Sequence, residues 1–537
     1  MTTRTASVPA EHPGAGVQSS AVDCCGPRLH GLFGDSWCGP SATAQLAARL
    51  DRLGLRPGVR VLVSDESTPA LALVLATLMT MNVSIVLLDR GLPPAAVADI
   101  ARRTGSGAVV GPHLLDAQDG AAPPHVLGTA DSLVVGVTGR CAGRCSGDDD
   151  RAARLAAWRT REDALLMWTS GSSGPPKGLV KSGAAVVSNV EATVAALAYR
   201  EDDVLLPLLP LTHQYGMSLV IIWWLVGCDL VLGNHRRPLS TIRQARALRP
   251  TVVDAVPPVY QSLLGVLATE GVRALAPSVR LWCVGGSPLS PLLAARFREL
   301  TGQPLLDGYG STEAGNVALA TLDDDRDLGR PLPGIEVDVR TSAGGTCAIG
   351  EPGEIWLRSP YLFSRYLDSD VTAPNPRSWF PTGDVGTLDE LGRLQVLGRA
   401  HAVHRGGFTL YPASIERAAA SAGISLLMVV LPDDRMGSHL TAVIEDVSVR
   451  SAATWSDLLR QELADYEQPN RILVVEAFPR LSNGKADLAR LISLAQQSRS
   501  SARSAGVAAR PPHPLPSVQE SRDDDLHRDP SNQQVAE

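Results

Sequence analysis

Short apolar runs alternate with longer stretches of helical periodicity through the first 300 residues of the chain. The pattern predicts a strand at 59–63, a buried helix at 69–81 and a second strand at 83–88. The alternation continues at 98–112, 186–208, 215–233, 241–254, 257–269 and 279–299. Because strands that alternate with helices usually pair in parallel, the pattern predicts an α/β domain with parallel sheets.

Two stretches of this region differ from the rest. Residues 116–160 break the alternation with Gly, Pro and an acidic run, which predicts a long surface insertion. Residues 219–226 are strongly apolar, but Asp229 follows too soon for a membrane span of about 20 residues. We therefore expect a core helix there and no contact with a membrane.

The pattern changes at about residue 330. Short Val/Ile/Leu segments separated by Gly and Pro predict an antiparallel β subdomain, and a compact α+β unit fits residues 400–495. The two ends of the chain are polar and rich in small residues, so we expect them to be disordered. The predicted division is a disordered segment at 1–31, a large domain at 32–398, a small domain at 399–496 and a disordered tail at 497–537.

Composition narrows the class of protein. The 537 residues are 44% hydrophobic and 20% charged, as in soluble globular proteins. The formal net charge of −7 argues against nucleic acid as a partner. No basic start followed by an apolar stretch precedes residue 30, and the pairs Cys24–Cys25 and Cys141–Cys145 lack the companion ligands of a zinc site. We therefore expect reduced cysteines and a cytoplasmic protein.

The most informative motif is the glycine- and hydroxyl-rich stretch 167–178, which follows the apolar run 164–168. Its glycines would let backbone N–H groups approach a polyphosphate, and Lys177 would neutralise charge. The spacing is not that of a Walker A loop. The chain has three lysines, at 177, 181 and 485, among 49 lysine and arginine residues. A retained lysine is therefore a candidate for a compact point charge.

Five further segments follow in order. They are 209–216 with His213, 284–288 with two glycines after a strand, 307–313 with an aromatic, a hydroxyl and an acid, 379–384 with Asp384 on a turn, and Gly398-Arg399 with the distant Gly484-Lys485. Taken singly, each has an ordinary structural explanation. Tyr309 could be core packing, His213 a buried histidine, and Glu313 a helix cap. Their common order favours one nucleotide-dependent enzyme.

In these motifs the chain resembles the adenylate-forming superfamily, which includes acyl- and aryl-CoA synthetases, peptide-synthetase adenylation domains and firefly luciferase. The resemblance covers about residues 32–495. It implies a large domain of α/β subdomains with a distorted β-barrel subdomain, and a small mobile α+β domain. It also implies the following nucleotide-binding residues: Thr169, Ser170, Gly171, Ser172, Ser173, Gly174, Lys177, Gly285, Gly286, Ser287, Asp307, Gly308, Tyr309, Gly310, Asp384 and Arg399.

The resemblance also implies individual roles. The loop 169–177 would hold the β- and γ-phosphates of ATP. Tyr309 would stack on adenine, and Gly285 to Ser287 would line the other face of the base. Asp307 would accept a hydrogen bond from the adenine amino group. Asp384 would accept the ribose hydroxyls with help from Arg399.

The resemblance implies four catalytic residues. Thr312 would touch the α-phosphate, Glu313 would bind Mg²⁺, and His213, in an apolar setting before a core helix, is a further catalytic candidate. Lys485 would bridge the substrate carboxylate and the α-phosphate. A cation there would stabilise charge at phosphorus, which is the main requirement of the reaction.

The sequence departs from the family pattern at several positions. Gly183 replaces the usual histidine six residues after the loop lysine, and Arg365-Tyr366 replaces Gly-Tyr. His401 stands at the hinge, where an Asp or Lys is usual, and Ser414 replaces an acid. These changes leave the adenylation groups intact and affect the hinge and the thiol tunnel. No acid follows His213, which disfavours an amino-acid substrate and favours an aryl or acyl acid.

Three functions remain open from the sequence. The first is an ATP-dependent acid–thiol ligase that uses CoA or the phosphopantetheine thiol of a carrier protein supplied in trans. The second is an amide synthetase of secondary metabolism that passes the adenylated acid to an amine. The third is a non-catalytic protein on the same scaffold.

Overall fold

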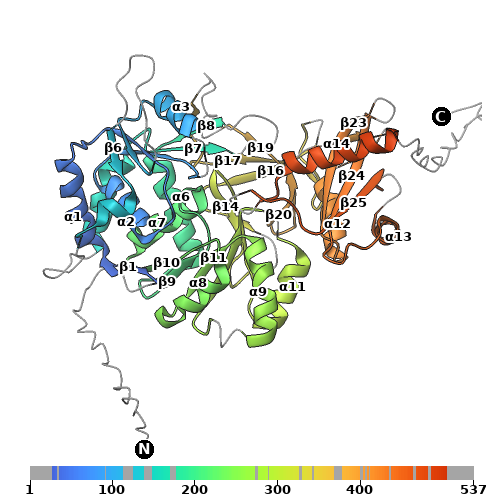
Figure 1. Cartoon of the computed structure of the whole chain (residues 1–537), viewed down its shortest axis with the longest axis horizontal. Coiled ribbons are helices and arrows are strands. Elements are labelled where there is room, and N and C mark those ends of the chain that lie inside the picture. Colours follow the sequence, from blue (N-terminus) through green and yellow to red (C-terminus); the bar gives the residue numbers. More distant parts are fainter. Residues whose placement is uncertain are drawn as a thin grey trace, which may run out of the picture.

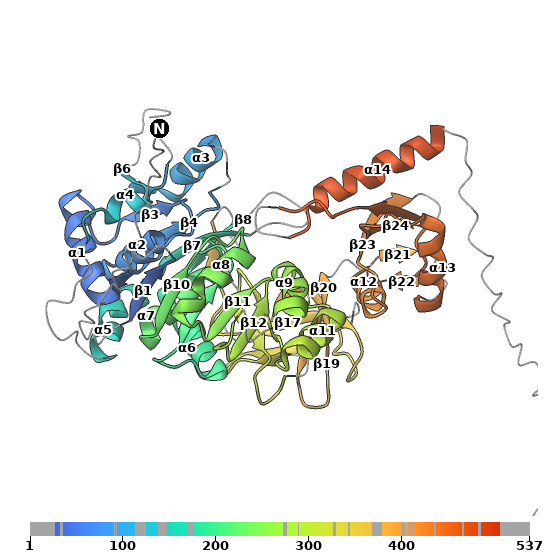
Figure 2. The same ribbon diagram turned by 60° about the horizontal axis from the view of Figure 1, so that its bottom comes forward.

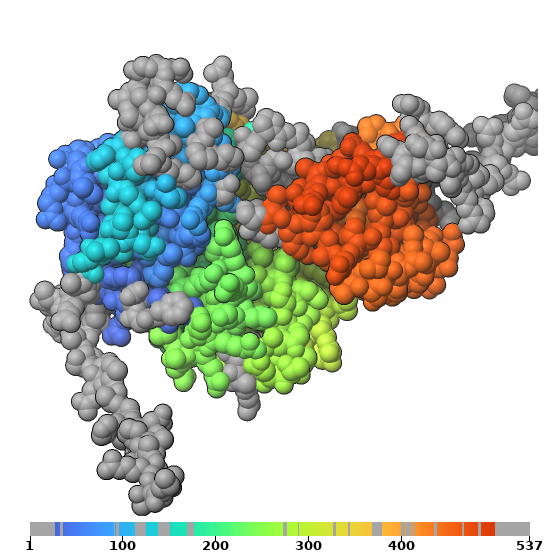
Figure 3. Space-filling model, in the orientation of Figure 1, coloured from blue at the N-terminus to red at the C-terminus, as the bar shows by residue number. Residues whose placement is uncertain are grey.

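The computed structural model of the chain describes residues 27–32, 36–90, 92, 94–112, 125–137, 148–169, 177–271, 276–287, 289–325, 329–341, 344–367, 378–399, 403–405, 408–410, 412–433, 437–463, 467–481 and 485–504. Figure 1 shows two parts, a large one in blue to yellow and a small one in orange and red. Figure 3 shows the small part standing against one side of the large one.

The first sheet of the large domain has seven strands. In spatial order they are β18 (Arg365–Tyr366), β8 (Lys177–Lys181), β7 (Leu165–Thr169), β4 (Ser84–Leu87), β3 (Arg60–Val63), β5 (Ala108–Val110) and β6 (His125–Gly128). The strands from β7 to β6 pair in parallel, and β8 and β18 are antiparallel additions at one edge. The predicted strands at 59–63 and 83–88 are thus confirmed and lie side by side.

The second sheet has nine strands. Their order is β15 (Arg330–Pro331), β14 (Gly315–Leu319), β13 (Leu306–Ser311), β12 (Leu281–Gly285), β11 (Val252–Ala255), β9 (Val204–Pro207), β10 (Asp229–Leu232), β1 (Arg28–Gly31) and β2 (Ser36–Cys38). The six strands from β13 to β1 are parallel. Ligands of parallel sheets bind outside the carboxyl ends of the strands, so this edge is where a site is expected.

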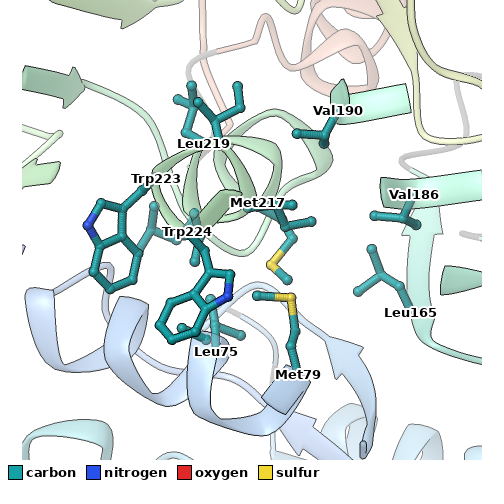
Figure 4. Close-up of a cluster of buried hydrophobic side chains, with 14 of the residues drawn as sticks. Leu75, Met79, Leu165, Val186, Val190, Met217, Leu219, Trp223 and Trp224 are labelled. Atoms are coloured by element: carbon teal, nitrogen blue, oxygen red, sulfur yellow. The ribbon is translucent and has the colours of Figure 1, made fainter. Parts of the chain in front are cut away.

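Helices fill the layer between the two sheets. They are α1 (Gly39–Arg52), α2 (Pro69–Thr80), α4 (Ala130–Val134), α5 (Asp148–Arg159), α6 (Gly183–Leu197) and α7 (Gln214–Val226). Figure 4 shows Leu75 and Met79 of α2 facing Met217 and Trp224 of α7, and these side chains belong to one buried cluster that includes both sheets. The apolar helices predicted at 69–81 and 219–226 are therefore confirmed as core.

The start of α2 illustrates how the local sequence sets an element. Thr68 lies in an extended conformation, its side-chain oxygen accepts the backbone N–H of Leu71, and Pro69 occupies the first turn. A capping hydroxyl followed by Pro is a strong helix-start signal.

The outer faces of the sheets carry other helices. On the nine-stranded sheet these are α8 (Pro238–Ala245), a short 3₁₀ turn (Arg246–Leu248), α9 (Pro257–Glu270) and α11 (Pro291–Thr301), and on the seven-stranded sheet α3 (Pro94–Thr104). Each sheet is thus covered on both faces, which explains its continuous apolar strands.

The antiparallel region predicted after residue 330 is a four-stranded sheet. Its order is β16 (Glu336–Arg340), β17 (Gly353–Arg358), β19 (Phe380–Leu388) and β20 (Leu394–Arg399). All its pairings are antiparallel. The sheet stands where the β-barrel subdomain was expected.

The small domain has its own core. It contains β21 (Val403–Arg405), β22 (Phe408–Leu410), α12 (Pro412–Ser421), β23 (Leu426–Asp433), β24 (Gly437–Glu445), α13 (Ala452–Glu462), β25 (Arg471–Val475) and α14 (Leu488–Ser504). Figure 2 shows the segment before α14 extending toward β8 of the large domain.

Three sequence-based expectations need correction. Residues 28–31, expected in a disordered segment, form β1 inside the nine-stranded sheet. The region 116–160 includes β6, α4 and α5, and Trp158 of α5 is fully buried with its indole N–H donating to the carbonyl oxygen of Val83 at 2.9 Å. Residues 497–504, expected in the tail, continue α14. Tertiary pairing supplies the order that local composition did not indicate.

Candidate active site

Two residues far apart in the chain meet where the nine-stranded sheet approaches the four-stranded sheet. The hydroxyl of Tyr309 on β13 donates a hydrogen bond of 2.6 Å to Oδ2 of Asp384 on β19. Asp384 is 7% exposed, and its backbone N–H donates to Oγ1 of Thr382 at 3.0 Å. The residues predicted to bind adenine and ribose are therefore adjacent, and the carboxylate is held in one orientation.

Arg399 lies opposite Asp384 in the ladder between β19 and β20. Its backbone is described and its side chain is not, so the predicted assistance to the ribose-binding acid stays a prediction. The pairing places the end of the large domain directly beside the Tyr309–Asp384 pair.

The predicted base-binding glycines lie at the carboxyl ends of neighbouring parallel strands. Gly285 at the end of β12 pairs with Gly308 on β13, next to Asp307. Gly286 has φ +85°, a left-handed conformation that favours glycine. At Gly310 a Cβ would lie 2.5 Å from the carbonyl oxygen of Gly315, so only glycine fits the bulge of β13. Glycines therefore let other groups approach the backbone closely at this strand edge, as the Tyr215 ring does at Gly285.

The phosphate loop connects β7 and β8. Thr169 and Lys177 are paired at the two ends of this hairpin. The loop residues 170–176, which include the predicted contacts at 170–174, lie outside the described residues. Nζ of Lys177 lies 5.6 Å from the centroid of the Tyr366 ring. Lys177 is exposed. It begins β8, which pairs with the edge strand β18, and its ammonium group lies over the ring of Tyr366 in that strand.

Thr312 and Glu313 follow β13 and are partly exposed. The backbone N–H of Phe363 donates to the carbonyl oxygen of Glu313 at 2.9 Å. Burial, with the nearby Glu313 carboxylate, raises the pKa of Tyr366. The loop lysine lies over this tyrosine ring and the predicted Mg²⁺ ligand influences the same tyrosine, so both residues lie in the neighbourhood of Tyr366.

Lys181 lies beneath this segment and was not among the predicted site residues. It is fully buried, and its Nζ donates to the carbonyl oxygen of Thr312 at 3.4 Å. Burial lowers its pKa to about 8, against an opposing effect of the Glu313 carboxylate. Its rarity as one of three lysines was the only sign of it in the sequence.

His213 is the residue immediately before α7. Its Nε2 lies 3.9 Å from Oδ2 of Asp89 and has no hydrogen-bond partner among the described residues. Burial of the ring lowers its pKa, Asp89 opposes this effect, and Lys485 lowers the pKa further. The charge of Lys485 therefore lies within electrostatic range of His213, although the two residues belong to different domains.

Lys485 is exposed and sits on a tight connection. Its carbonyl oxygen accepts the backbone N–H of Leu481 at 2.8 Å, and residues 482–484 between them lie outside the described residues. This connection brings the predicted catalytic lysine of the small domain to the His213 side of the large domain.

A buried carboxyl group supports the wall beside His213. Oδ1 of Asp254 on β11 accepts the hydroxyl of Tyr215 at 3.0 Å. Burial raises the pKa of Asp254 to about 7, against the effect of hydrogen bonds from Tyr215 and Cys283. A Cβ at Gly285 would lie 3.3 Å from the Tyr215 ring. A lone acid in the apolar run 252–255 was the sequence signal for this residue, and it was missed.

The predicted residues thus gather along one edge of the large domain. Tyr309, Asp384 and Gly285 are within one strand-end cluster, Glu313 and Lys177 both lie near Tyr366, and Lys485 approaches His213. Together they offer hydrogen-bond acceptors for a nucleoside, a carboxylate for a divalent cation and two exposed ammonium groups. This set is suited to chemistry at a phosphate.

A family model described as AMP-binding enzyme matches residues 41–367. A curated relative, the 2-succinylbenzoate–CoA ligase of Enterococcus faecalis, is 30% identical over 332 residues, 60% of this chain and 67% of the relative.

Solved structures of other enzymes share the fold of this chain. The amide bond synthetase McbA from Marinactinospora thermotolerans has a TM-score of 0.72 at 26% identity, over 87% of this chain and 97% of that one. ATP-bound MatB from Rhodopseudomonas palustris has a TM-score of 0.73 at 23% identity, over 88% and 96%. Within the described part of the chain, no helix is long and apolar enough to cross a membrane.

Proposed function

The chain belongs to the AMP-binding enzyme family, and we propose that it adenylates an aryl or acyl carboxylic acid and transfers the acyl group to the thiol of CoA or of a carrier protein. The 2-succinylbenzoate–CoA ligase relative, whose name gives an aryl acid, supports this substrate class. The proposal places the protein in the cytoplasm and in secondary metabolism, as the sequence predicts.

One observation carries the proposal. Lys485 of the small domain lies within electrostatic range of His213, on the same edge of the large domain as the hydrogen-bonded pair Tyr309 and Asp384. A cation on the edge that also carries the pair assigned to the nucleoside is what the first half-reaction requires, because negative charge accumulates around the α-phosphorus.

In the adenylation step, a carboxylate oxygen of the acid attacks the α-phosphorus of ATP. The bond between this phosphorus and the bridging oxygen breaks, and pyrophosphate leaves with the bonding electrons. Asp384 and Tyr309 would hold the nucleoside, Lys177 would face the β- and γ-phosphates, and Lys485 would neutralise charge on the reacting carboxylate and phosphate. Thr312 would hydrogen-bond to the α-phosphate.

The residues present fit a magnesium ion. Glu313 offers a partly exposed carboxylate, and hard oxygen ligands together with ATP phosphates are what Mg²⁺ prefers. Glu313 would hold the ion, which when bound supplies charge neutralisation at the phosphates.

In the second step, the thiolate of the acceptor attacks the acyl carbon of the acyl-adenylate. The bond between acyl carbon and phosphate oxygen breaks, AMP leaves, and a thioester forms. The positions predicted to govern this step, His401 at the hinge and the side chain of Ser414, lie outside what the structure describes. The neighbouring Glu416 of α12 is half-buried and accepts the backbone N–H of Met428 at 2.7 Å.

A second candidate acceptor is an amine, which would give an amide in place of the thioester. Two observations favour it. The chain departs from the family pattern at 401 and 414, where the thiol reaction would be affected. The chain is also 26% identical to an amide bond synthetase over 87% of this chain and 97% of that one.

The test is pyrophosphate release by the full chain with ATP, Mg²⁺ and a panel of benzoic, cinnamic, fatty and amino acids. Each acid is assayed with no acceptor, with CoA and with a mixture of amines, and products are identified by mass. Turnover that rises with CoA and yields an acyl-CoA supports the thiol ligase. Turnover that rises only with an amine and yields an amide replaces it by the second candidate.

Lys485→Ala, assayed beside the wild type, reports background hydrolysis, because it lacks the cation assigned to the reacting carboxylate and phosphate. If the wild type shows no acid-dependent pyrophosphate release above this background, the adenylation proposal is overturned.

A further inference from the structure

Lys181 is an unusual residue for its position. It is the last residue of β8 and is fully buried, although an ammonium group is rarely buried unless a partner compensates its charge. Its strand neighbour Leu179 lies in the core between the two sheets, and residues two apart in a strand share a face. The side chain of Lys181 therefore enters this apolar layer from the edge of the seven-stranded sheet.

The partners of this ammonium lie in the segment that follows β13. Nζ donates to the carbonyl oxygen of Thr312 at 3.4 Å, and the carboxylate of Glu313 is close enough to favour the charged form of the lysine. Lys181 thus faces, from the protein side, the two residues assigned to the α-phosphate and to Mg²⁺.

The same segment is held on its other sides. The backbone N–H of Phe363 donates to the carbonyl oxygen of Glu313 at 2.9 Å, and that of Ser364 donates to the carbonyl oxygen of Val180 on β8 at 2.7 Å. The segment 363–364 therefore ties the strand that carries Lys181 to the backbone of Glu313.

Asn189 of α6 holds the end of the turn between β13 and β14 by uncharged hydrogen bonds. Its Nδ2 donates to the carbonyl oxygen of Asn316 at 2.7 Å, and its Oδ1 accepts the backbone N–H of Asn316 at 2.9 Å. Asn189 is 1% exposed. The turn between β13 and β14 thus rests on a buried amide at one end and on a buried cation at the other.

We propose that Lys181 is a positioning residue for adenylation: it holds the Thr312 carbonyl and partly neutralises Glu313, which directs both side chains toward the triphosphate. This rests on the proposed function, because it assumes that Thr312 and Glu313 face ATP. An apolar residue would pack in the same layer, but it would leave the Thr312 carbonyl without its donor and the Glu313 carboxylate without its nearby cation.

The charge of Lys181 has a consequence that packing does not have. A cation behind Glu313 weakens the attraction of this carboxylate for a divalent ion. Removing the cation should therefore loosen the alignment of Thr312 and Glu313, and slow the reaction, without weakening metal binding. Damage to the fold would weaken both.

The test compares Lys181→Met, which has similar length and no charge, with Asn189→Ala, which loosens the same turn without changing charge. We measure kcat and KM for pyrophosphate release, Mn²⁺ affinity of the enzyme–ATP complex by electron paramagnetic resonance, and thermal unfolding. For Lys181→Met we expect kcat to fall by about 10- to 100-fold, with Mn²⁺ affinity unchanged or tighter. For Asn189→Ala we expect any loss of kcat to accompany weaker Mn²⁺ binding and lower stability.

The proposal is overturned if Lys181→Met keeps kcat within threefold of the wild type, or if its kcat, Mn²⁺ affinity and stability fall together as in Asn189→Ala. If Lys181→Met does not fold, Lys181→Leu replaces it, because leucine is likewise uncharged and offers no donor to Thr312, and the same outcomes apply. If no acid is turned over by the wild type, the proposed function fails by itself. Mn²⁺ affinity then decides the inference: tighter binding in Lys181→Met supports it, and unchanged or weaker binding overturns it.

Discussion

Tyr309 donates a 2.6 Å hydrogen bond to Asp384, 75 positions further along the chain, and so joins the parallel sheet to the antiparallel one. This hydrogen bond orients the Asp384 carboxyl group as well as connecting the two sheets. A nucleoside bound beside this pair would meet an aromatic face and a fixed acceptor. Two variants separate these contributions.

The first prediction concerns the carboxylate and its tyrosine partner. Asp384→Ala removes the acceptor and should raise KM for ATP at least about tenfold. Tyr309→Phe keeps the ring but loses the hydrogen bond, and should raise the same KM by about three- to tenfold. Steady-state pyrophosphate release at varied ATP measures both. An unchanged nucleotide KM in Asp384→Ala would contradict the assignment to the ribose.

The second prediction concerns Lys485. Lys485→Ala should lower the adenylation rate at least about a hundredfold while ATP still binds, because the lost cation acts mainly on the transition state. Pyrophosphate release and nucleotide binding by calorimetry measure the two effects. Arg490→Ala is the control, since it removes an exposed positive charge from the same domain on α14. A near-normal rate in Lys485→Ala would refute a catalytic role.

The third prediction concerns the buried Asp254. Burial raises its pKa from 3.8 to about 7, so between these values the folded state holds a proton that the unfolded state has lost. The free energy of unfolding should therefore fall as pH rises through this window, by up to about 1.4 kcal/mol per pH unit. The contribution is largest below the unfolded pKa and is lost above the folded one.

Asp254→Asn should remove this share of the pH dependence, because asparagine still accepts from Tyr215 and does not titrate. Urea unfolding at pH 5 and pH 8 measures this dependence. The free energy of unfolding of the variant, relative to that of the wild type, should be higher at pH 8 than at pH 5. Glu416 in the small domain, whose pKa burial also raises to about 7, keeps its own contribution in both proteins. A constant difference between the two proteins across this range would refute the prediction.

The fourth prediction concerns stability away from the site. Asp203 is 2% exposed. Its carboxylate accepts hydrogen bonds from Nε of Arg280 at 2.8 Å and from the hydroxyl of Thr251 at 2.7 Å. Burial raises its pKa, but these hydrogen bonds outweigh burial and the pKa is lowered. Asp203→Ala would leave the Arg280 guanidinium without its carboxylate partner, at a cost of about 3–5 kcal/mol in the free energy of unfolding.

Chemical denaturation at pH 7 measures this cost. The matched control is Glu299→Ala, which breaks the exposed pair with Arg296 on α11 and should change stability by at most about 1 kcal/mol. The lowered pKa of Asp203 also means that its contribution is lost as pH falls through the folded pKa. Equal effects of the two variants would contradict the assigned importance of burial.

Local sequence was a good guide wherever neighbouring residues set the structure. Thr68 and Pro69 start α2 by capping and by a fixed φ, and the apolar run at 219–226 could only be stable inside a core. The order of the motifs also indicated the family, because glycines, hydroxyls and single charges at these spacings suit a nucleotide.

Local sequence was a poor guide where pairing partners are distant. Residues 28–31 and 125–128 look like loops by composition, yet each gains a strand partner from elsewhere in the chain. Trp158 ends a polar-looking stretch and is buried because α5 packs against α2 and α7. Such order comes from contacts that a local window does not contain.

The sequence alone determined the alternation of strands and helices, the family and the candidates Lys177, Tyr309, Glu313, Asp384 and Lys485, because these follow from residue type and spacing. Only the tertiary structure decided that Tyr309 bonds to Asp384, that Lys181 lies beneath Thr312 and that the buried carboxyl group of Asp254 supports Tyr215. The reason is physical: hydrogen-bond partners and pKa values depend on burial and on neighbours brought together from distant segments, and neither is encoded in local spacing.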